Sequence, residues 1–186
     1  VDHDDEDTII MALVDAAVGY LDGWTGILGR CLEEQEWRQD FDGFSACLRL
    51  PLWPVISVSS LVWRNGTGQV ATISSDNYAL KSDARGAYVR FRNDFVYPGD
   101  LYETGAVVVT YWAGYPRQGV VEADPNAEPP VEADPGTSTV PAPIKTAILL
   151  LVGHWYQNRE AVAEGSHTVL PMAADALVSP YRRVDV

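Results

Sequence analysis

Hydrophobic residues recur at helical spacing near both ends of the chain and at alternate positions in between. Near the start, an apolar stripe with the period of an α-helix follows Asp7, which can cap that helix and place a negative charge at the positive end of its dipole. The stripe predicts an amphipathic helix that needs a partner helix and that ends at the glycines beyond residue 22. Its members are Ile10, Leu13, Ala17, Leu21 and Trp24.

A second helical pattern starts at Pro141 to Pro143, where proline is tolerated in a first turn, and runs to about Ala161. Its apolar stripe consists of Ile144, Ile148, Leu151 and Trp155. After this helix we expect a short third one, from Pro171 to Leu177, that stops before Pro180. Both ends of the chain are therefore predicted to be helical.

From Cys31 to Trp112 the hydrophobic period changes to two, which is typical of half-buried β-strands. Asn65-Gly66 is the clearest hairpin signal, because both residues tolerate a positive φ. The region therefore predicts an antiparallel sheet. Its expected strands are Glu36 to Phe41, Cys47 to Leu50, Val55 to Trp63, Gln69 to Ile73, Tyr88 to Arg92 and Ala106 to Trp112.

The order of these patterns predicts an α+β fold, with a helical bundle formed by both chain ends and an antiparallel β-domain inserted between them. We expect residues 1–30 to form an acidic tail and the first bundle helix, and residues 31–115 to form the β-domain. Residues 141–186 would supply the remaining helices and a C-terminal tail.

Residues 116–140 stand apart in composition. The sequence VEADP occurs twice, at Val121 to Pro125 and at Val131 to Pro135, and the stretch from Arg117 to Thr139 carries five acids, one base and dense proline. Such a segment buries too little apolar area to offset the entropy of ordering, so we expect an extended, mobile loop. Two copies are too few for a repeat fold.

The composition indicates a folded, acidic protein. Of its 186 residues, 47% are hydrophobic, and 26 acidic residues against 13 basic ones leave a formal net charge of -13. A chain of this charge as a whole is not expected to hold nucleic acid by neutralising phosphates. The longest strongly apolar run, Ala147 to Val152, is far shorter than the roughly 18 residues that a membrane span requires, and no leader pattern is present, so we expect synthesis in the cytoplasm.

No catalytic or cofactor pattern competes with this picture. The three histidines, His3, His154 and His167, are scattered, and no nucleophile elbow accompanies them. Cys31 and Cys47 have no metal-ligand spacing, which favours free thiols. We therefore expect no enzyme activity, no metal and no cofactor.

Three arginines alternate with two aromatic residues on one predicted strand. Arg85, Arg90 and Arg92 interleave with Tyr88 and Phe91, the arrangement of a single-strand nucleic-acid platform. In a chain of net charge -13, a solvated strand face or a contact with an acidic partner is the favoured interpretation.

The most specific stretch is Val140 to Arg183, which reads VPAPIKTAILLLVGHWYQNREAVAEGSHTVLPMAADALVSPYRR. Together with LRLPLWPVISVSSLVW at Leu48 to Trp63 and VVVTYWAGYP at Val107 to Pro116, this ordered run resembles the head-tail connector (adaptor) proteins of long-tailed bacteriophages and gene transfer agents. The Ala-rich N-terminal helix ending near Trp24 also fits the longer members. The acidic insert has no fixed counterpart in that pattern.

The resemblance implies a structural virion protein at the head-tail junction. It would form a ring, commonly of twelve copies, between the portal protein and the head-closure (stopper) or tail proteins, with an axial channel for double-stranded DNA that it does not bind sequence-specifically. No cofactor and no membrane are implied. Expected portal or subunit contacts are Arg159, Glu160, Tyr181, Arg182 and Arg183; expected channel or assembly residues are Glu122, Asp124, Glu128, Glu132 and Asp134.

A second hypothesis comes from another class of protein. Trp53, Trp63 and Trp112 could stack on sugar rings, as in a monomeric carbohydrate-binding or receptor-binding β-domain of a virion. The same residues alternate within strands, which is also typical of core or inter-subunit packing.

Overall fold

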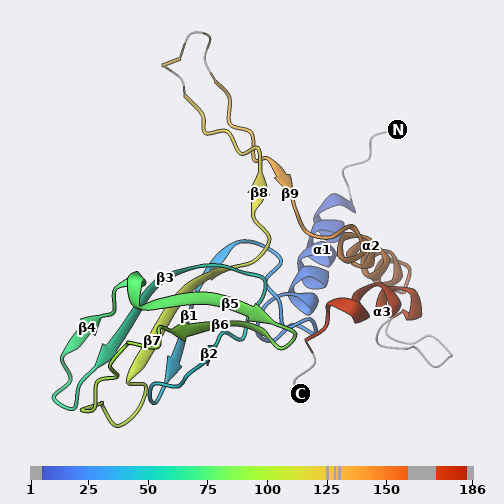
Figure 1. The fold of residues 1–186 in the computed structure, drawn as a ribbon. Helices are drawn as coiled ribbons and strands as arrows, with labels where there is room; N and C mark the ends of the chain where they lie inside the picture. Colours follow the sequence, from blue (N-terminus) through green and yellow to red (C-terminus); the bar gives the residue numbers. More distant parts are fainter. Residues whose placement is uncertain (1–5, 125, 128, 130, 159–170, 184–186) are drawn as a thin grey trace. The chain divides into compact units, whose positions relative to one another are not determined.

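The computed structural model describes residues 6–124, 126–127, 129, 131–158 and 171–183 (Figure 1). The regular structure of these residues consists of three α-helices, nine β-strands and two short 3-10 helices. The fold is α+β, as the sequence predicts. These residues divide into two compact units, one from Glu33 to Pro116 and one comprising the residues before and after it.

The helical unit contains α1 (Asp7–Leu21), α2 (Ala142–Gln157) and α3 (Met172–Val178). Helix α1 contacts α2, and α2 contacts α3. Pro143 lies in the first turn of α2, where its missing N–H costs no hydrogen bond. The part of α2 beyond Gln157 that the sequence predicts, up to Ala161, lies mostly outside the described residues.

The predicted apolar stripes supply the core of this unit. Ala17 and Leu21 of α1 and Ile144 and Leu151 of α2 are fully buried. The ring of Tyr20 packs edge-on against that of Trp155, with centroids 6.3 Å apart, and the hydroxyl of Tyr156 donates a hydrogen bond to the carboxylate of Glu6. The two helices are thus joined by apolar packing and by a polar contact.

Two expectations for α1 are corrected. Asp7 is the first helical residue and Glu6 is the N-cap, without a side-chain capping bond, so Asp7 acts only through its charge in the first turn. Ile10 and Trp24 of the predicted stripe are exposed. Periodicity identifies the apolar face of a helix, but it does not determine over what length another element covers that face.

The β unit consists of two antiparallel sheets. The first has the order β1-β7-β3-β4 and the second has the order β2-β6-β5. The strands of the first sheet are β1 (Gln35–Phe41), β3 (Val55–Arg64), β4 (Val70–Thr72) and β7 (Val107–Ala113); those of the second are β2 (Leu48–Arg49), β5 (Tyr78–Asp83) and β6 (Gly86–Phe91).

Strand β7 lies between β1 and β3 and forms the centre of the core. Trp37 and Val58 are the cross-strand partners of Tyr111, and the backbone N–H of Leu52 donates to the Tyr111 hydroxyl at 3.3 Å. A buried tyrosine thereby gains a partner for its polar end. Other side chains of this core are Leu48, Leu50, Leu52, Leu61, Val89, Val107 and Val109.

The hairpin predicted at Asn65-Gly66 is present between β3 and β4, but its turn is built differently. The Asn65 side-chain oxygen accepts hydrogen bonds from the backbone N–H groups of Thr67 and Gln69, at 3.1 and 2.8 Å, and the positive φ of 85° is at Gly68. The asparagine therefore acts as a hydrogen-bond acceptor that closes a wider loop, rather than as a residue of positive φ.

Candidate assembly surfaces

The C-terminal tip, Ser179 to Arg183, is bound to the rest of the helical unit. Residues Ser179–Tyr181 form the 3-10 helix η3, and Arg182 pairs with Asp175 of α3 at 2.6 Å. The backbone N–H of Arg183 donates to the carbonyl of Leu28 at 3.0 Å. The sequence alone suggests an exposed aromatic and basic tip, whereas the structure holds much of it in intramolecular contacts.

Arg30 provides the second anchor of the tip. Its guanidinium donates a hydrogen bond to the backbone carbonyl of Tyr181 and lies 5.9 Å from the centre of the Tyr181 ring. A cation over an aromatic face adds modest stability at a half-buried site. Of the expected contact residues, Tyr181, Arg182 and Arg183 are therefore held against the rest of the helical unit. Arg159 and Glu160 lie outside the described residues.

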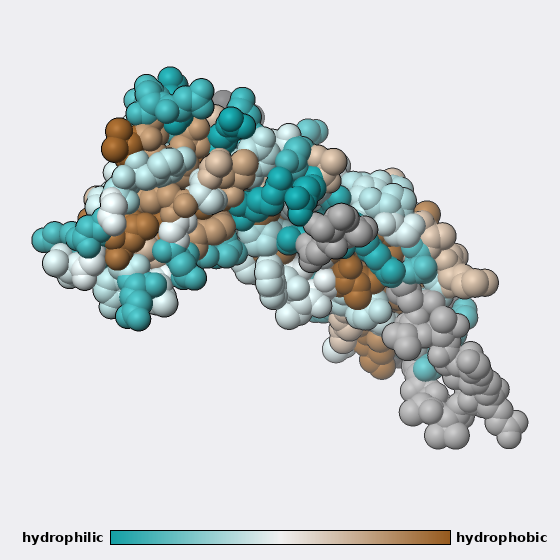
Figure 2. All heavy atoms as spheres, turned by 60° about the horizontal axis from the view of Figure 1, so that its bottom comes forward, coloured by the Kyte–Doolittle hydropathy of each residue, from teal (hydrophilic) through white to brown (hydrophobic). Residues whose placement is uncertain are grey.

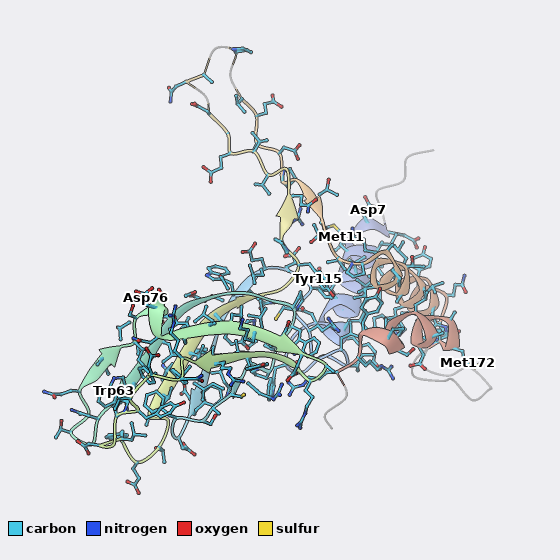
Figure 3. The ribbon with its side chains drawn as sticks, in the orientation of Figure 1. Asp7, Met11, Trp63, Asp76, Tyr115 and Met172 are labelled. Carbon is cyan, nitrogen blue, oxygen red and sulfur yellow. The ribbon has the colours of Figure 1, made fainter. Side chains whose placement is uncertain are left out.

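Large apolar side chains project from all three helices of this unit. Met11 of α1 and Leu149 of α2 are each 67% exposed, and Met172 of α3 is 83% exposed. Figure 3 shows the labelled Met11 and Met172 on their helices, and Figure 2 shows hydrophobic surface interleaved with hydrophilic residues on the face it displays. The predicted stripes of the two long helices do not include Met11 or Leu149, and no stripe is predicted for the short helix that contains Met172.

The acidic insert forms a paired hairpin, which we call the acidic arm (residues 117–138). Strand β8 (Arg117–Gln118) pairs with β9 (Thr137–Ser138), and two further antiparallel bridges join Val121 to Asp134 and Asp124 to Val131. The sequence predicts an extended, mobile loop here, and the structure adds that its two halves pair through the backbone. Cross-strand hydrogen bonds supply the ordering that a core would otherwise provide.

The two VEADP copies pair with each other inside the arm. Val121 and Asp134 exchange two backbone hydrogen bonds of 2.9 Å, and Asp124 and Val131 exchange two of 3.0 Å. The first residue of each copy thus lies opposite the fourth residue of the other. The Oδ1 atoms of both aspartates also accept a backbone N–H two residues further on, from Asn126 and Gly136.

The charge of the arm is exposed. Glu122, Asp124, Glu132 and Asp134 are all solvent-accessible, while Glu128 lies outside the described residues. Side chains tipped with red oxygen atoms project along the length of the arm in Figure 3. No Lys or Arg occurs from Gln118 to Ile144, so no base within this stretch of sequence offsets these carboxylates.

The three-stranded sheet carries the opposite charge on its outer face. In the ladder, Lys81 and Arg49 both lie opposite Tyr88, and Arg90 lies opposite Ala79. Arg49 pairs with Asp83 through two hydrogen bonds of 3.0 and 2.8 Å, and this contact lowers the pKa of Asp83 to about 2. The negative charge of Asp83 is thereby balanced by the positive charge of Arg49.

An open depression of about 370 Å³ lies on this sheet, which we call the basic depression. Its lining is Ala79, Lys81, Arg90, Phe91, Arg92 and Asn93. The three cations are exposed, and none of them forms an ion pair within the described part of the chain. Because Ala79 is small, the space opposite Arg90 stays unfilled.

The sequence reveals only part of this surface. Arg85, Arg90 and Arg92 are identified from their alternation with aromatics. Lys81 is not identified because strand β5 is missed, and Arg49 is not identified because its strand, β2, is distant in sequence. The signal for β5 is present in the alternation of Tyr78 and Leu80, followed by a turn in which Asp83 accepts the N–H of Arg85 at 2.8 Å.

The tryptophans proposed to bind sugar do not form one platform. Trp63 is the cross-strand partner of Val107, whereas Trp112 is five residues further along β7 and so lies on the opposite face of that sheet. Trp53 lies outside both sheets and packs against Gly86. The arrangement favours packing roles over a shared stacking surface.

Two other kinds of feature are absent from the described residues. No cluster of three or more His, Cys, Asp or Glu side chains there is arranged to hold a metal ion. None of the described helices combines the length and hydropathy needed to span a bilayer. Of the two cysteines, Cys31 is buried and Cys47 is half-buried.

Comparison with known proteins gives matches to solved structures alone. No protein-family model matches the sequence, and a search of curated proteins gives no match. A chain from the virion of a native gene transfer agent particle matches 97% of this chain and 80% of its own length, at 20% identity and a TM-score of 0.67.

Two chains from neck structures match as well. One, from the neck of an empty gene transfer agent particle computed with C6 symmetry, covers all of this chain and 83% of its own, at 19% identity and a TM-score of 0.67. The other, from the neck of a native particle computed with C12 symmetry, covers 96% and 84%, at 18% identity and a TM-score of 0.62. This α+β chain therefore has the fold of chains found in the virion and neck of gene transfer agent particles.

Proposed function

We propose that this chain is a head-tail connector (adaptor) of a tailed phage-like or gene transfer agent particle. The observation that carries the proposal is a structural similarity to neck chains that extends over 96 to 100% of this chain. A match of this extent covers residues of both units, whereas a match to the β unit alone would suit many kinds of binding module.

The proposed assembly is a ring of twelve copies that lies between the portal protein and the head-closure or tail proteins. The neck structures of the similar chains were computed with C12 and C6 symmetry, and a ring of twelve identical subunits is compatible with both. Double-stranded DNA would pass through the axial channel. A net charge of -13 on each copy would repel the phosphates and keep the DNA from adhering.

The helical unit is proposed as the portal or subunit contact. It would act as a bundle, with Tyr181, Arg182 and Arg183 held in place on it and with Met11, Leu149 and Met172 as exposed apolar contacts. Aromatic, arginine and methionine side chains are enriched at protein interfaces. In this role the chain positions other proteins and performs no chemistry, and no cofactor is proposed.

The proposal is tested by mixing the full chain with purified portal rings and measuring the sedimentation of each component. We expect the chain to co-sediment with the portal. A variant with Arg183→Glu and Met172→Ser should bind more weakly, whereas Arg38→Glu on the outer face of β1 serves as a charge-change control and should bind as the wild type does. A chain that stays monomeric and does not co-sediment at any portal concentration would overturn the proposal.

A further inference from the structure

Opposite charges are concentrated on two separate surfaces of this chain. Residues 33–116 carry seven Lys and Arg against ten Asp and Glu, so only three of the 13 excess negative charges lie there. The acidic arm and the helical segments carry the other ten. The basic depression is thus a local positive surface on a strongly acidic protein.

From this complementarity we propose that the acidic arm of one copy binds the basic depression of a neighbouring copy. The proposal rests on the ring assembly proposed above, in which each subunit has two neighbours. Such a contact is heterologous, because the arm of each copy meets a different surface on the next. Heterologous contacts form a ring when the rotation from copy to copy closes, as in the assembly proposed above.

The chemistry of the two surfaces fits. The arm offers Glu122, Asp124, Glu132 and Asp134, and the depression offers Lys81, Arg90 and Arg92. Arginine binds carboxylates with two parallel hydrogen bonds, so Arg90 and Arg92 suit carboxylate partners better than lysines would. Asp83 does not compete for these cations, since it is already paired with Arg49.

The shape of the arm also favours docking. Its backbone is ordered by four cross-strand pairs, which are Arg117–Ser138, Gln118–Thr137, Val121–Asp134 and Asp124–Val131. A preformed hairpin loses less conformational entropy on binding than an unpaired loop would. Strand β5 is the edge of its sheet, so no further strand of that sheet lies beside Lys81.

The alternative occupant of the basic depression is nucleic acid. We favour the arm, because the rest of the molecule carries the remaining ten excess acids, and these would repel a phosphate backbone on approach. The experiment below separates the two occupants.

The chain contains only two lysines, Lys81 and Lys145, which makes the contact accessible to a zero-length crosslink between amine and carboxylate. Isotopically light and heavy copies of the full chain are mixed in concentrated solution and on portal rings, treated with a carbodiimide, and digested for mass spectrometry. We expect light-heavy crosslinks from Lys81 to arm carboxylates. Lys81→Arg keeps the charge and should remove this crosslink while oligomers persist.

Two charge variants give a stronger test. One reverses the depression (Lys81→Glu, Arg90→Glu, Arg92→Glu), and the other reverses the arm (Glu122→Lys, Asp124→Lys, Glu132→Lys, Asp134→Lys). Each alone should lose about tenfold or more in self-association, the combined effect of several ion pairs. A 1:1 mixture should recover it, since every contact in an alternating ring would then join opposite charges.

Three results would overturn the proposal: crosslinks confined to one chain, no crosslink to the arm, or a 1:1 mixture that fails to recover self-association. Retention of DNA that depends on Arg90 and Arg92 would also overturn it, in favour of nucleic acid as the occupant. If the full chain fails to bind portal rings while the 1:1 mixture of the two charge variants recovers self-association, the proposed function is rejected and the contact between arm and depression is retained.

Discussion

Gly86 lies against the indole ring of Trp53 so closely that a Cβ atom at this position would be 2.2 Å from Cζ2 of the tryptophan. Gly86 also has a φ of 118°, a conformation that side chains other than glycine rarely adopt. Trp53 therefore packs on bare backbone at the start of strand β6. Two independent reasons, space and φ, require glycine there.

Replacing Gly86 with alanine should therefore destabilise the protein by about 2–5 kcal/mol, the sum of backbone strain and overpacking. Denaturant unfolding measures the change. Gly153→Ala is the matched control: a Cβ at this position of α2 meets no atom within 4 Å, so the variant should be more stable by about 0.5–1 kcal/mol. Equal effects of the two substitutions would contradict this account.

The core of the helical unit can be tested at two residues of α2 that are close in sequence. Leu151 is fully buried, so Leu151→Ala should lower the free energy of unfolding by about 2–5 kcal/mol. Leu149 is exposed, and Leu149→Ala should change it by less than about 0.5 kcal/mol in the isolated protein. If Leu151→Ala costs less than about 1 kcal/mol, the core is assigned to the wrong face.

The Arg49–Asp83 pair predicts a pH dependence. Because Arg49 lowers the pKa of Asp83 from 3.8 to about 2, the contribution of the pair to stability is fully present above the ordinary pKa. It is lost as the pH falls from about 4 to about 2. An NMR titration of the Asp83 carboxyl carbon should show this pKa, and Arg49→Gln should raise it toward 3.8. An unchanged pKa in Arg49→Gln would show that the pair does not form in solution.

The C-terminal tip gives a fourth prediction. From the sequence, deletion of residues 179–186 is expected to leave the fold intact and prevent portal attachment. The structure instead predicts a less stable protein, because the deletion removes the Arg183–Leu28 hydrogen bond and the Arg182–Asp175 ion pair.

Thermal unfolding distinguishes the two expectations. The half-exposed ion pair itself is worth little, so Asp175→Asn should cost about 0.5–1 kcal/mol, and the full deletion should cost clearly more. A deletion variant as stable as the wild type would restore the expectation from the sequence. Portal binding is better tested with Arg183→Glu, whose backbone contact to Leu28 is retained.

Local patterns predict most of the elements. The stripes of Ile144, Leu151 and Ala17 locate two helices, and alternation locates six of the seven strands of the β unit. Strand β5 is missed because Lys81, Ser82 and Asp83 make half of it polar, as suits an edge strand with an exposed face.

The candidate surfaces are less predictable, because they depend on contacts between residues distant in sequence. Nothing near Arg183 in the sequence indicates that its N–H meets the carbonyl of Leu28, and nothing near Lys81 indicates that Arg49 lies across the sheet from it. Composition identifies the acidic segment correctly, but it does not reveal that the two VEADP copies pair with each other.

The acidic arm is built from two copies of one short sequence that pair with each other. In most hairpins the two strands must acquire matching sequences independently, since each contributes a different half of the ladder. Here the valine of each copy pairs with the aspartate of the other copy, so one tandem duplication supplies both strands together with both aspartates that accept a local backbone N–H. An arm of this kind can therefore arise in a single genetic event, and we expect it to lengthen or shorten by matched units on both strands.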